Sequence, residues 1–328
     1  MRLNKSSSYV LIYLLQGYET APAISEQLKS VDIRSIQRSL IRLVDLGIIT
    51  RNGTNNNPTY SVNYPQLIVS DIDEKLLEDE NRPSTTLNHQ FIAWLDGLSS
   101  EVLEELFGNH AVKYEPGTQM TPKELEYLTV ELSWKSSSLE GNTYTLLDTQ
   151  LLLTEGIKAK NRTEFETQMI LNHKDAISFI VENPELFTSS VVFPTIEELH
   201  RIIGRNLGIE SGVRKKIVRI SASNYEPLSG PQQLREAVDT VLSVISRVAD
   251  PFARALLALT LIPYLQVFED GNKRTGRMLA NALLITTIGK GFSLRKTEAR
   301  ELALAYLSFY EFNSVKPLSK ILDKELSR

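Results

Sequence analysis

Cysteine is absent from this chain of 328 residues, which excludes disulfide bonds and thiolate metal sites. The sequence also lacks an apolar run long enough to cross a bilayer, so we expect no membrane partner. The run Tyr9–Leu15 follows positive residues and mimics a secretory signal, but it also fits the first helix of the module described below, which we favour. We therefore expect a cytoplasmic protein, whose length suits two domains or one large domain with an added module.

An excess of either charge is also lacking, with 36 basic and 40 acidic side chains, but the charges are unevenly distributed. Residues 1–63 carry seven Lys and Arg against four Asp and Glu, a balance of +3 that leaves −7 for the remainder. A mildly basic head on an acidic body is compatible with contact to nucleic acid. The asymmetry alone does not decide between such contact and an ordinary surface.

The first 63 residues have the pattern of three short helices followed by a strand, a turn and a second strand. The first helix ends at Gly17, Ser25 is a candidate N-cap for the second, and Asp32 is a candidate N-cap for the third. This order, with a polar turn between the strands, resembles the winged helix-turn-helix family. The resemblance implies an α+β domain over residues 1–63.

The third helix would be the recognition helix of such a domain. Its apolar stripe faces the core, which leaves Arg34, Gln37, Arg38 and Arg42 on the outer face. Arginine and glutamine suit base edges and phosphates in a major groove, so these four residues are candidates for DNA binding. An ordinary solvated helix face, or a winged helix that contacts protein, would give the same pattern.

From residue 64 the character of the chain changes. The segment 64–109 is rich in Asp and Glu, and we interpret it as an acidic linker with a connecting helix and a short strand at Leu67–Val69. From about residue 90 the pattern is mainly helical, and a strand-like pattern returns only at Lys216–Ile220. A mainly α domain is therefore expected over 110–328.

The stretch 268–277 carries the chemistry. It is a tight loop that leads into a helix N-terminus, where unpaired main-chain N–H groups favour an anion. Gly271 lets the backbone approach a ligand, and three cationic side chains follow within a short distance, namely Lys273, Arg274 and Arg277. Asp270 adds a carboxylate that can hold Mg²⁺ together with phosphates. Together they suit a nucleoside triphosphate such as ATP.

The stretch Gln266–Arg277 resembles the signature loop of the Fic family, H-P-F-x-D-G-N-G-R-x-x-R. The resemblance implies a helical bundle of the bacterial Fic type that transfers AMP from ATP to a hydroxyl of a target protein. It also implies a role for each matching residue. Phe268 would anchor the loop, Asp270 would bind Mg²⁺, Gly271 and Asn272 would form the anion cradle, and Arg274 and Arg277 would hold phosphates.

Three positions depart from this pattern. Gln266 stands where the family has its catalytic histidine, and an amide cannot take a proton at neutral pH. Val267 replaces a proline, and Pro263 interrupts the helix that leads into the loop. Lys273 replaces the second glycine and resembles the phosphorylating Doc branch, but kinase activity does not follow from it. No nearby residue substitutes for the base, and His200 matches a packing histidine of the family.

A second motif lies upstream, near residues 130–142. Ser136, Glu140 and Gly141 match the Fic inhibitory-helix pattern, [S/T]-x-x-x-E-[G/N]. The resemblance implies autoinhibition, with Glu140 paired to Arg277 by two hydrogen bonds in the place of a phosphate. Residues 211–220 further resemble the family's β-hairpin flap, which aligns a target segment by strand addition.

The sequence therefore predicts a Fic-type nucleotide-binding protein whose adenylyltransferase activity is impaired or altered at Gln266. Its expected ligands are ATP and Mg²⁺, and its expected partner is a protein with a Ser, Thr or Tyr hydroxyl. An alternative is a winged-helix transcriptional regulator that uses the Fic domain to sense nucleotide or as a scaffold. The sequence is also compatible with a homodimer.

Overall fold

The computed structural model describes residues 3–108, 114–115 and 117–327. Residue 110, where the second domain was expected to begin, lies outside the described residues. The chain divides into two compact units. The first comprises Met1–Trp94, Val218–Pro227 and Ala303–Pro317, and the second comprises Leu95–Ile217, Leu228–Leu302 and Leu318–Arg328. No helix of the described part is long and apolar enough to span a membrane.

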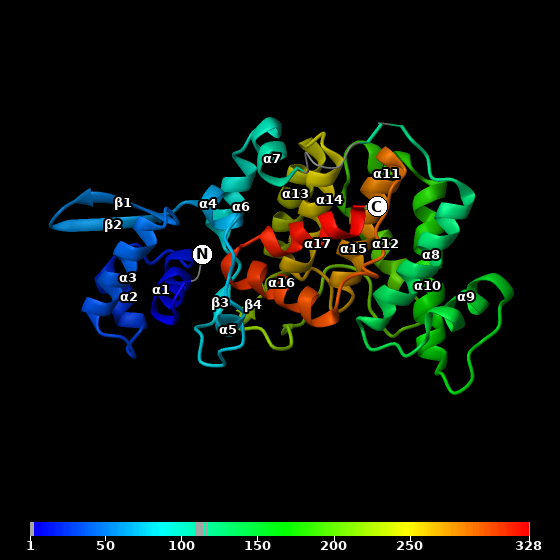
Figure 1. Cartoon of the computed structure of the whole chain (residues 1–328), viewed down its shortest axis with the longest axis horizontal. Helices are drawn as coiled ribbons and strands as arrows, with labels where there is room; N and C mark the ends of the chain where they lie inside the picture. The colour runs from blue at the N-terminus through cyan, green and yellow to red at the C-terminus, as the bar shows by residue number, and fades with distance from the viewer. Residues whose placement is uncertain (1–2, 109–113, 116, 328) are drawn as a thin grey trace. The chain divides into compact units, whose positions relative to one another are not determined.

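The first unit opens with the expected order of elements, three helices and a hairpin (Figure 1). These are α1 (Lys5–Leu15), α2 (Ala21–Gln27), α3 (Ile33–Asp45), β1 (Ile49–Thr54) and β2 (Asn57–Val62). The strands are antiparallel, with Ile49 opposite Val62. Asp32 caps α3, since its carboxylate accepts from the Ser35 N–H at 3.0 Å. Ser25 does not cap α2: it lies inside that helix, which Thr20 caps and which begins earlier because a proline suits its first turn.

The acidic linker expected at 64–109 is wrong, because residues 64–94 of this segment fold into the first unit. It forms α4 (Tyr64–Ile68), α5 (Glu74–Leu77), β3 (Thr85–Thr86) and α6 (His89–Asp96). The strand expected at 67–69 is the end of α4, which buries Leu67 and starts with a proline in its first turn. The acidic charge does not keep the segment extended, because several carboxylates have basic partners: Asp71 pairs with Lys316 and Asp79 with Lys5, both at 2.7 Å.

A buried ion pair ties the pieces of the first unit together. Arg82 contacts Glu311 at 2.5 Å, and the Glu311 carboxylate also accepts from the main-chain N–H of Asn224 at 3.0 Å. Beside this pair, β3 lies parallel to β4 (Tyr225–Glu226). Three stretches that are distant in sequence therefore share one buried polar cluster.

The second unit is a helical bundle. Its helices are α7 (Ser100–Phe107), α8 (Pro122–Ser138), α9 (Leu146–Glu155), α10 (Glu164–Glu182), α11 (Glu185–Thr188), α12 (Phe193–Gly204), α13 (Pro231–Arg247), α14 (Pro251–Leu265), α15 (Asn272–Ile288) and most of α17 (Lys316–Leu326), while α16 (Ala299–Phe312) crosses the division (Figure 1). Every residue of α14 is buried. A helix that is apolar all round belongs in the centre of a fold, and α14 packs there against α15.

The expected hairpin flap is not present. Residues 211–220 contain no strand, so the strand predicted at Lys216–Ile220 is wrong. The buried side chain of Arg214 instead donates hydrogen bonds to main-chain carbonyls in and near this region. Arg214 donates to the carbonyl of Lys216 at 2.7 Å and to the carbonyl of Leu228. A carbonyl already bound by a guanidinium is satisfied without a neighbouring strand.

Candidate functional site

The stretch Gln266–Arg277 lies between the two central helices, and we call it the signature loop. Gln266 ends α14 in the left-handed conformation, with φ of 50°. The side chain of Asn272 then closes the loop: its Oδ1 accepts from the Phe268 N–H at 2.9 Å, and its Nδ2 donates to the Phe268 carbonyl at 2.8 Å. Because Asn272 is buried, these bonds are shielded from water and hold the turn in one shape.

Aromatic stacking anchors the same loop from below. Phe268 is fully buried and lies against the ring of His200, with centroids 3.7 Å apart and planes 7° apart. His200 Nε2 lies 2.9 Å from the carbonyl oxygen of Asp270. Burial lowers the pKa of His200, so the ring is neutral and carries its proton on Nε2, the nitrogen that donates to this carbonyl. His200 thus packs under the loop.

The loop's carboxyl end presents donors without acceptors. Gly271 caps α15 at a φ of 78° with no side-chain cap, so the first-turn N–H groups of this helix stay available. Arg274 is 3% exposed, and its Nη2 contacts Asp270 at 2.9 Å. Its Nε and Nη1 are buried and have no hydrogen-bond partner among the described residues. Buried, unpaired guanidinium donors beside a helix N-terminus call for an anion.

Asp270 and Lys273 complete the charged surroundings of this end. Asp270 directs one oxygen to the Gly271 N–H at 2.6 Å and the other to Arg274, while its side chain stays largely exposed. Burial lowers the pKa of Lys273, although the nearby carboxylate of Glu140 acts in the opposite sense. No group of three or more His, Asp or Glu side chains is arranged for a metal in the described part of the chain. A single carboxylate, completed by phosphates and water, is nevertheless a common Mg²⁺ site.

The second arginine of the loop is fully engaged. Arg277 is 1% exposed, and its Nη2 meets Glu140 Oε1 at 2.7 Å, which is the expected ion pair. The pairing is not bidentate, however. Arg277 Nε instead donates to the hydroxyl of Ser136 at 3.1 Å, so the guanidinium is divided between two residues. We call Ser136, Glu140 and Arg277 the clamp.

The clamp is built at the end of a helix. Ser136 lies in the last turn of α8, and Glu140 follows that helix in a turn that Gly141 closes at a φ of 89°. Burial by itself would raise the pKa of Glu140, but the charge and hydrogen bond of Arg277, together with the charges of Arg274 and Lys273, outweigh burial and lower it. Glu140 is therefore an anion at neutral pH.

The amino end of the loop differs chemically. Gln266 is 8% exposed, and one end of its amide bonds to α14 while the other bonds within the loop. Nε2 donates to the Pro263 carbonyl at 2.7 Å, and Oε1 accepts from Asn272 at 3.2 Å. The amide is thus a structural cap on α14, and it has no group that can take up a proton at neutral pH.

Sequence reasoning missed Arg214, which supports this end. Its N–H donates to the Val267 carbonyl at 2.9 Å, and its Nε donates to the Gln266 carbonyl at 2.6 Å. A guanidinium at a helix C-terminus satisfies carbonyls that have no partner in the helix. A single arginine before two lysines gives no sign of this role, because only the folded chain brings it to residues 266–267.

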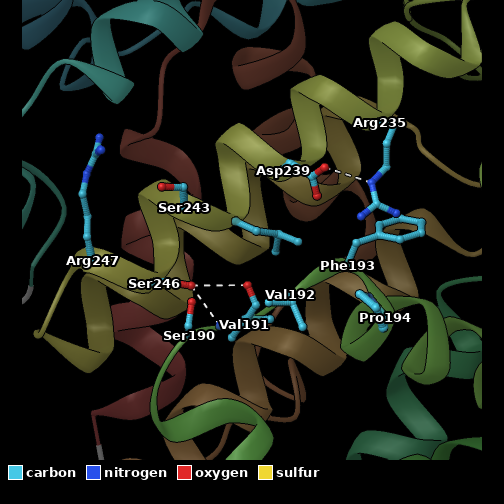
Figure 2. Close-up of a pocket in the computed structure, with 11 residues that line it drawn as sticks. Ser190, Val191, Val192, Phe193, Pro194, Arg235, Asp239, Ser243, Ser246 and Arg247 are labelled. Carbon is cyan, nitrogen blue, oxygen red and sulfur yellow. Dashed lines mark hydrogen bonds and ion pairs between the residues drawn. The ribbon is translucent and has the colours of Figure 1, made fainter.

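A pocket of about 460 Å³ lies between α13 and the segment that leads into α12 (Figure 2). Phe193 forms part of its wall, and the guanidinium of Arg235 lies over that ring at 4.1 Å from its centroid. Phe193 also stacks near Phe268, with centroids 6.3 Å apart. None of the residues predicted to bind nucleotide lines this pocket, so its volume does not locate the site.

The candidates for DNA binding lie in the other unit. Arg34, Gln37, Arg38 and Arg42 are all exposed on α3. Arg38 Nη2 donates to Ser35 at 2.9 Å, and this contact is exposed to solvent. The face is accessible and carries these four polar side chains together with the exposed Ile41, and an ordinary protein surface can have the same composition.

These features define a class of protein: a helical bundle in which a loop between two buried helices gathers arginines at a helix N-terminus. Residues 193–284 match the model of the Fic/DOC family, and the chain therefore contains a Fic domain.

Known relatives agree with this domain. The chain is 27% identical to protein adenylyltransferase Fic of Nematostella vectensis over 157 residues, 46% of this chain and 36% of that protein. It is 26% identical to protein adenylyltransferase fic-1 of Caenorhabditis elegans over 155 residues, 45% of this chain and 30% of that protein. The similarity thus spans about a third of these relatives' length.

Two solved structures share the fold. A Fic domain containing signaling protein from Bacteroides thetaiotaomicron has a TM-score of 0.50 at 19% identity, covering 73% of this chain and 94% of that one. Fic-1 from Caenorhabditis elegans also has a TM-score of 0.50, at 18% identity, covering 96% of this chain and 88% of that one. The mainly helical Fic fold predicted from the sequence is confirmed.

Proposed function

We propose that this chain is an ATP-binding, adenylyltransferase-like Fic protein that is restrained by its own clamp and impaired at the position of the base. The observation that carries the proposal is Arg274, a buried guanidinium with two nitrogens that have no partner in the described structure. An unpaired buried donor costs stability unless a ligand satisfies it. A triphosphate supplies acceptors of the right charge at that place.

The signature loop divides the work of holding ATP among its residues. Arg274, the N–H groups after Gly271 and, once it leaves the clamp, Arg277 would contact phosphate oxygens. Asp270 would hold Mg²⁺, which supplies charge neutralisation between phosphate oxygens. Phe268 and Asn272 keep the loop in shape, as their contacts with His200 and with the loop's main chain indicate.

The clamp restrains this site because Arg277 cannot serve two anions at once. In the unliganded chain its Nη2 is held by Glu140 and its Nε by Ser136. A phosphate that uses Arg277 must displace the carboxylate, and the free energy of that displacement is subtracted from nucleotide binding. We therefore propose that Glu140 and Ser136 are inhibitory residues.

The partner of an active form would be a protein with a Ser, Thr or Tyr hydroxyl. Transfer requires a base that removes the hydroxyl proton, and Gln266 has no such group. Loss of a general base costs about 10²- to 10⁴-fold in rate. We propose that ATP binding has been retained and that transfer has been lost or altered.

Calorimetric titration with ATP and Mg²⁺ tests the nucleotide claim directly. The Glu140→Gly variant should bind ATP at least about tenfold more tightly than the unchanged chain, since one charged hydrogen bond to Arg277 is worth about 1.5–3 kcal/mol. Glu155→Gly, at an exposed glutamate of the same unit, serves as the control and should leave the affinity unchanged. Absence of ATP binding in the Glu140→Gly variant would refute the proposal.

A second candidate function is regulation of transcription through a winged helix, for which the exposed face of α3, with its arginines and glutamine, is the specific support. Arg34, Gln37, Arg38 and Arg42 share this face beside the β1–β2 hairpin. The Fic domain would then sense nucleotide or act as a scaffold. Arg38→Ala should weaken binding to DNA from upstream of the coding region and reduce the salt dependence by about one phosphate contact. Equal DNA affinity and salt slope for both proteins would exclude direct contact by Arg38.

A further inference from the structure

A histidine that the proposed chemistry does not use lies directly behind the clamp. His173, on α10, is fully buried and faces the last turn of α8. Its Nε2 lies 2.9 Å from the hydroxyl of Ser136, and its Nδ1 lies 2.8 Å from the carbonyl oxygen of Met169. Because Ser136 also contacts Arg277, the ring stands one hydrogen bond away from the guanidinium.

The hydrogen bonds that link Met169, His173, Ser136 and Arg277 each have one possible direction. A carbonyl oxygen only accepts, so Nδ1 of His173 must carry a proton and donate to Met169. Burial is the main cause that lowers the pKa of His173, to about 3, so the ring is neutral and Nε2 has no proton. Nε2 therefore accepts, and the Ser136 hydroxyl must be its donor. Because the Ser136 hydroxyl donates its proton to His173, its oxygen is an acceptor for the Arg277 Nε–H, at 3.1 Å.

We infer that His173 is a positioning residue of the clamp: by accepting from Ser136, it makes this hydroxyl an acceptor for Arg277 and so holds the guanidinium away from nucleotide. The inference rests on the proposed function and adds to its regulation. All four residues of this hydrogen-bonded series, from Met169 to Arg277, belong to the same unit. The contacts among His173, Ser136 and Arg277 are buried, where hydrogen-bond direction is strictly enforced.

A serine without this support would be a poorer partner for Arg277. Its hydroxyl could rotate its proton toward the guanidinium, and two donors facing each other repel. The neighbouring Ser137 offers a matched control: it is equally buried on α8 and lies 3.4 Å from Nδ1 of the same ring, while Ser136 is the serine that bonds to Arg277.

ATP affinities measured by calorimetry with Mg²⁺ test this inference in two backgrounds, with and without the Ser136 hydroxyl. His173→Phe keeps a ring but removes the acceptor, and we expect ATP to bind about three- to tenfold more tightly, the range set by one hydrogen bond. His173→Gln can present an amide oxygen to Ser136 and should restore the original affinity. Ser137→Ala should leave it unchanged. In the Ser136→Ala background, where no hydroxyl is left for His173 to orient toward Arg277, His173→Phe should change the affinity by less than about twofold.

The same affinity for His173→Phe as for the unchanged chain, or an equal shift in both backgrounds, would overturn the inference, since the second result is that of a structural role. ¹⁵N NMR of the unliganded protein gives an independent readout, because the chain has only four histidines. We expect His173 to be neutral with its proton on Nδ1, and a proton on Nε2 would overturn the inference whether or not ATP binds. Failure of Glu140→Gly to bind ATP refutes the proposed function instead, and the NMR result still decides the hydrogen-bond order.

Discussion

The two ends of the signature loop differ in what they leave unsatisfied. At the carboxyl end, Arg274 keeps two buried guanidinium nitrogens without a partner in the described structure. At the amino end, Gln266 uses both ends of its amide on Pro263 and Asn272. One end is thus prepared for a ligand, while the other is complete without one. The difference shows that binding of nucleotide and removal of a proton are separate properties of this loop.

Glutamine suits this separation because its amide carries no titratable proton. Its Oε1 accepts from Asn272, the residue that also closes the loop through Phe268, so the residue at 266 takes part in shaping the anion cradle. A change at this position can therefore alter chemistry while the phosphate end persists. Substitutions at the Gln266 end and at the phosphate end of the loop should therefore have separate effects on transfer and on nucleotide binding.

The largest effect is expected from restoring a base. Gln266→His, combined with Glu140→Gly to open the clamp, should raise transfer of label from [α-³²P]ATP to protein by about 10²- to 10⁴-fold, because an imidazole can accept the hydroxyl proton. The measurement is the initial rate of labelling in a cell lysate. Gln266→Ala in the same background is the control and should stay inactive.

Two results would contradict the view that Gln266 is the reason for the missing proton acceptor. High activity with Gln266 in place would mean that another group removes the proton. An inactive Gln266→His variant that still binds ATP would mean that position 266 is not the only lesion. Parallel labelling with [γ-³²P]ATP separates AMP transfer from phosphate transfer, which matters because Lys273 resembles the phosphorylating branch.

The next largest effect concerns the phosphate end. Arg274→Ala in the Glu140→Gly background should weaken ATP binding by about 30-fold or more, since losing one partner of a buried, hydrogen-bonded charge pair costs about 2–5 kcal/mol. Calorimetry gives the affinity. Arg201→Ala, which removes an exposed arginine paired with Glu198, is the matched control and should change little. An equal loss in both variants would show that the effect is one of net charge.

Much of the signature loop could be predicted from the sequence, because the residues that build it are close together along the chain. The loop from Phe268 to Arg277 is contiguous, so its residue types and spacing already describe the anion site. The helix cap at Asp32 is equally local, because its hydrogen bond to the Ser35 N–H is completed within three residues. The ion pair of Glu140 with Arg277 spans 137 positions, and only the resemblance to a known motif predicted it.

The wrong predictions concern segments whose interaction partners are distant in sequence. Segment 64–109 was expected to be a linker because its carboxylates suggest contact with solvent, but partners such as Lys316 are distant in sequence. Residues 211–220 resemble the family's flap and include strand-like residues, yet Arg214 satisfies main-chain carbonyls from within the fold. His173 behind the clamp gave no signal either. A pattern in the sequence cannot report a partner that only folding supplies.

The smallest effect is a pH dependence of stability at the clamp. The pKa of Glu140 is lowered in the folded chain from its ordinary 4.5, so its contribution to stability is fully present above pH 4.5 and is lost as pH falls through the folded value, below 4.5. At pH 7, Glu140→Gln should reduce the free energy of unfolding by about 1–3 kcal/mol, the worth of a hydrogen bond to a charged group. The difference between the two proteins, measured by urea unfolding, should shrink as pH is lowered from 5 toward 3. Glu155→Gln, at an exposed position, should show no such convergence. If the Glu140 difference does not vary with pH, the carboxylate does not bind Arg277 as an ion, and the phosphate end is restrained by something other than charge.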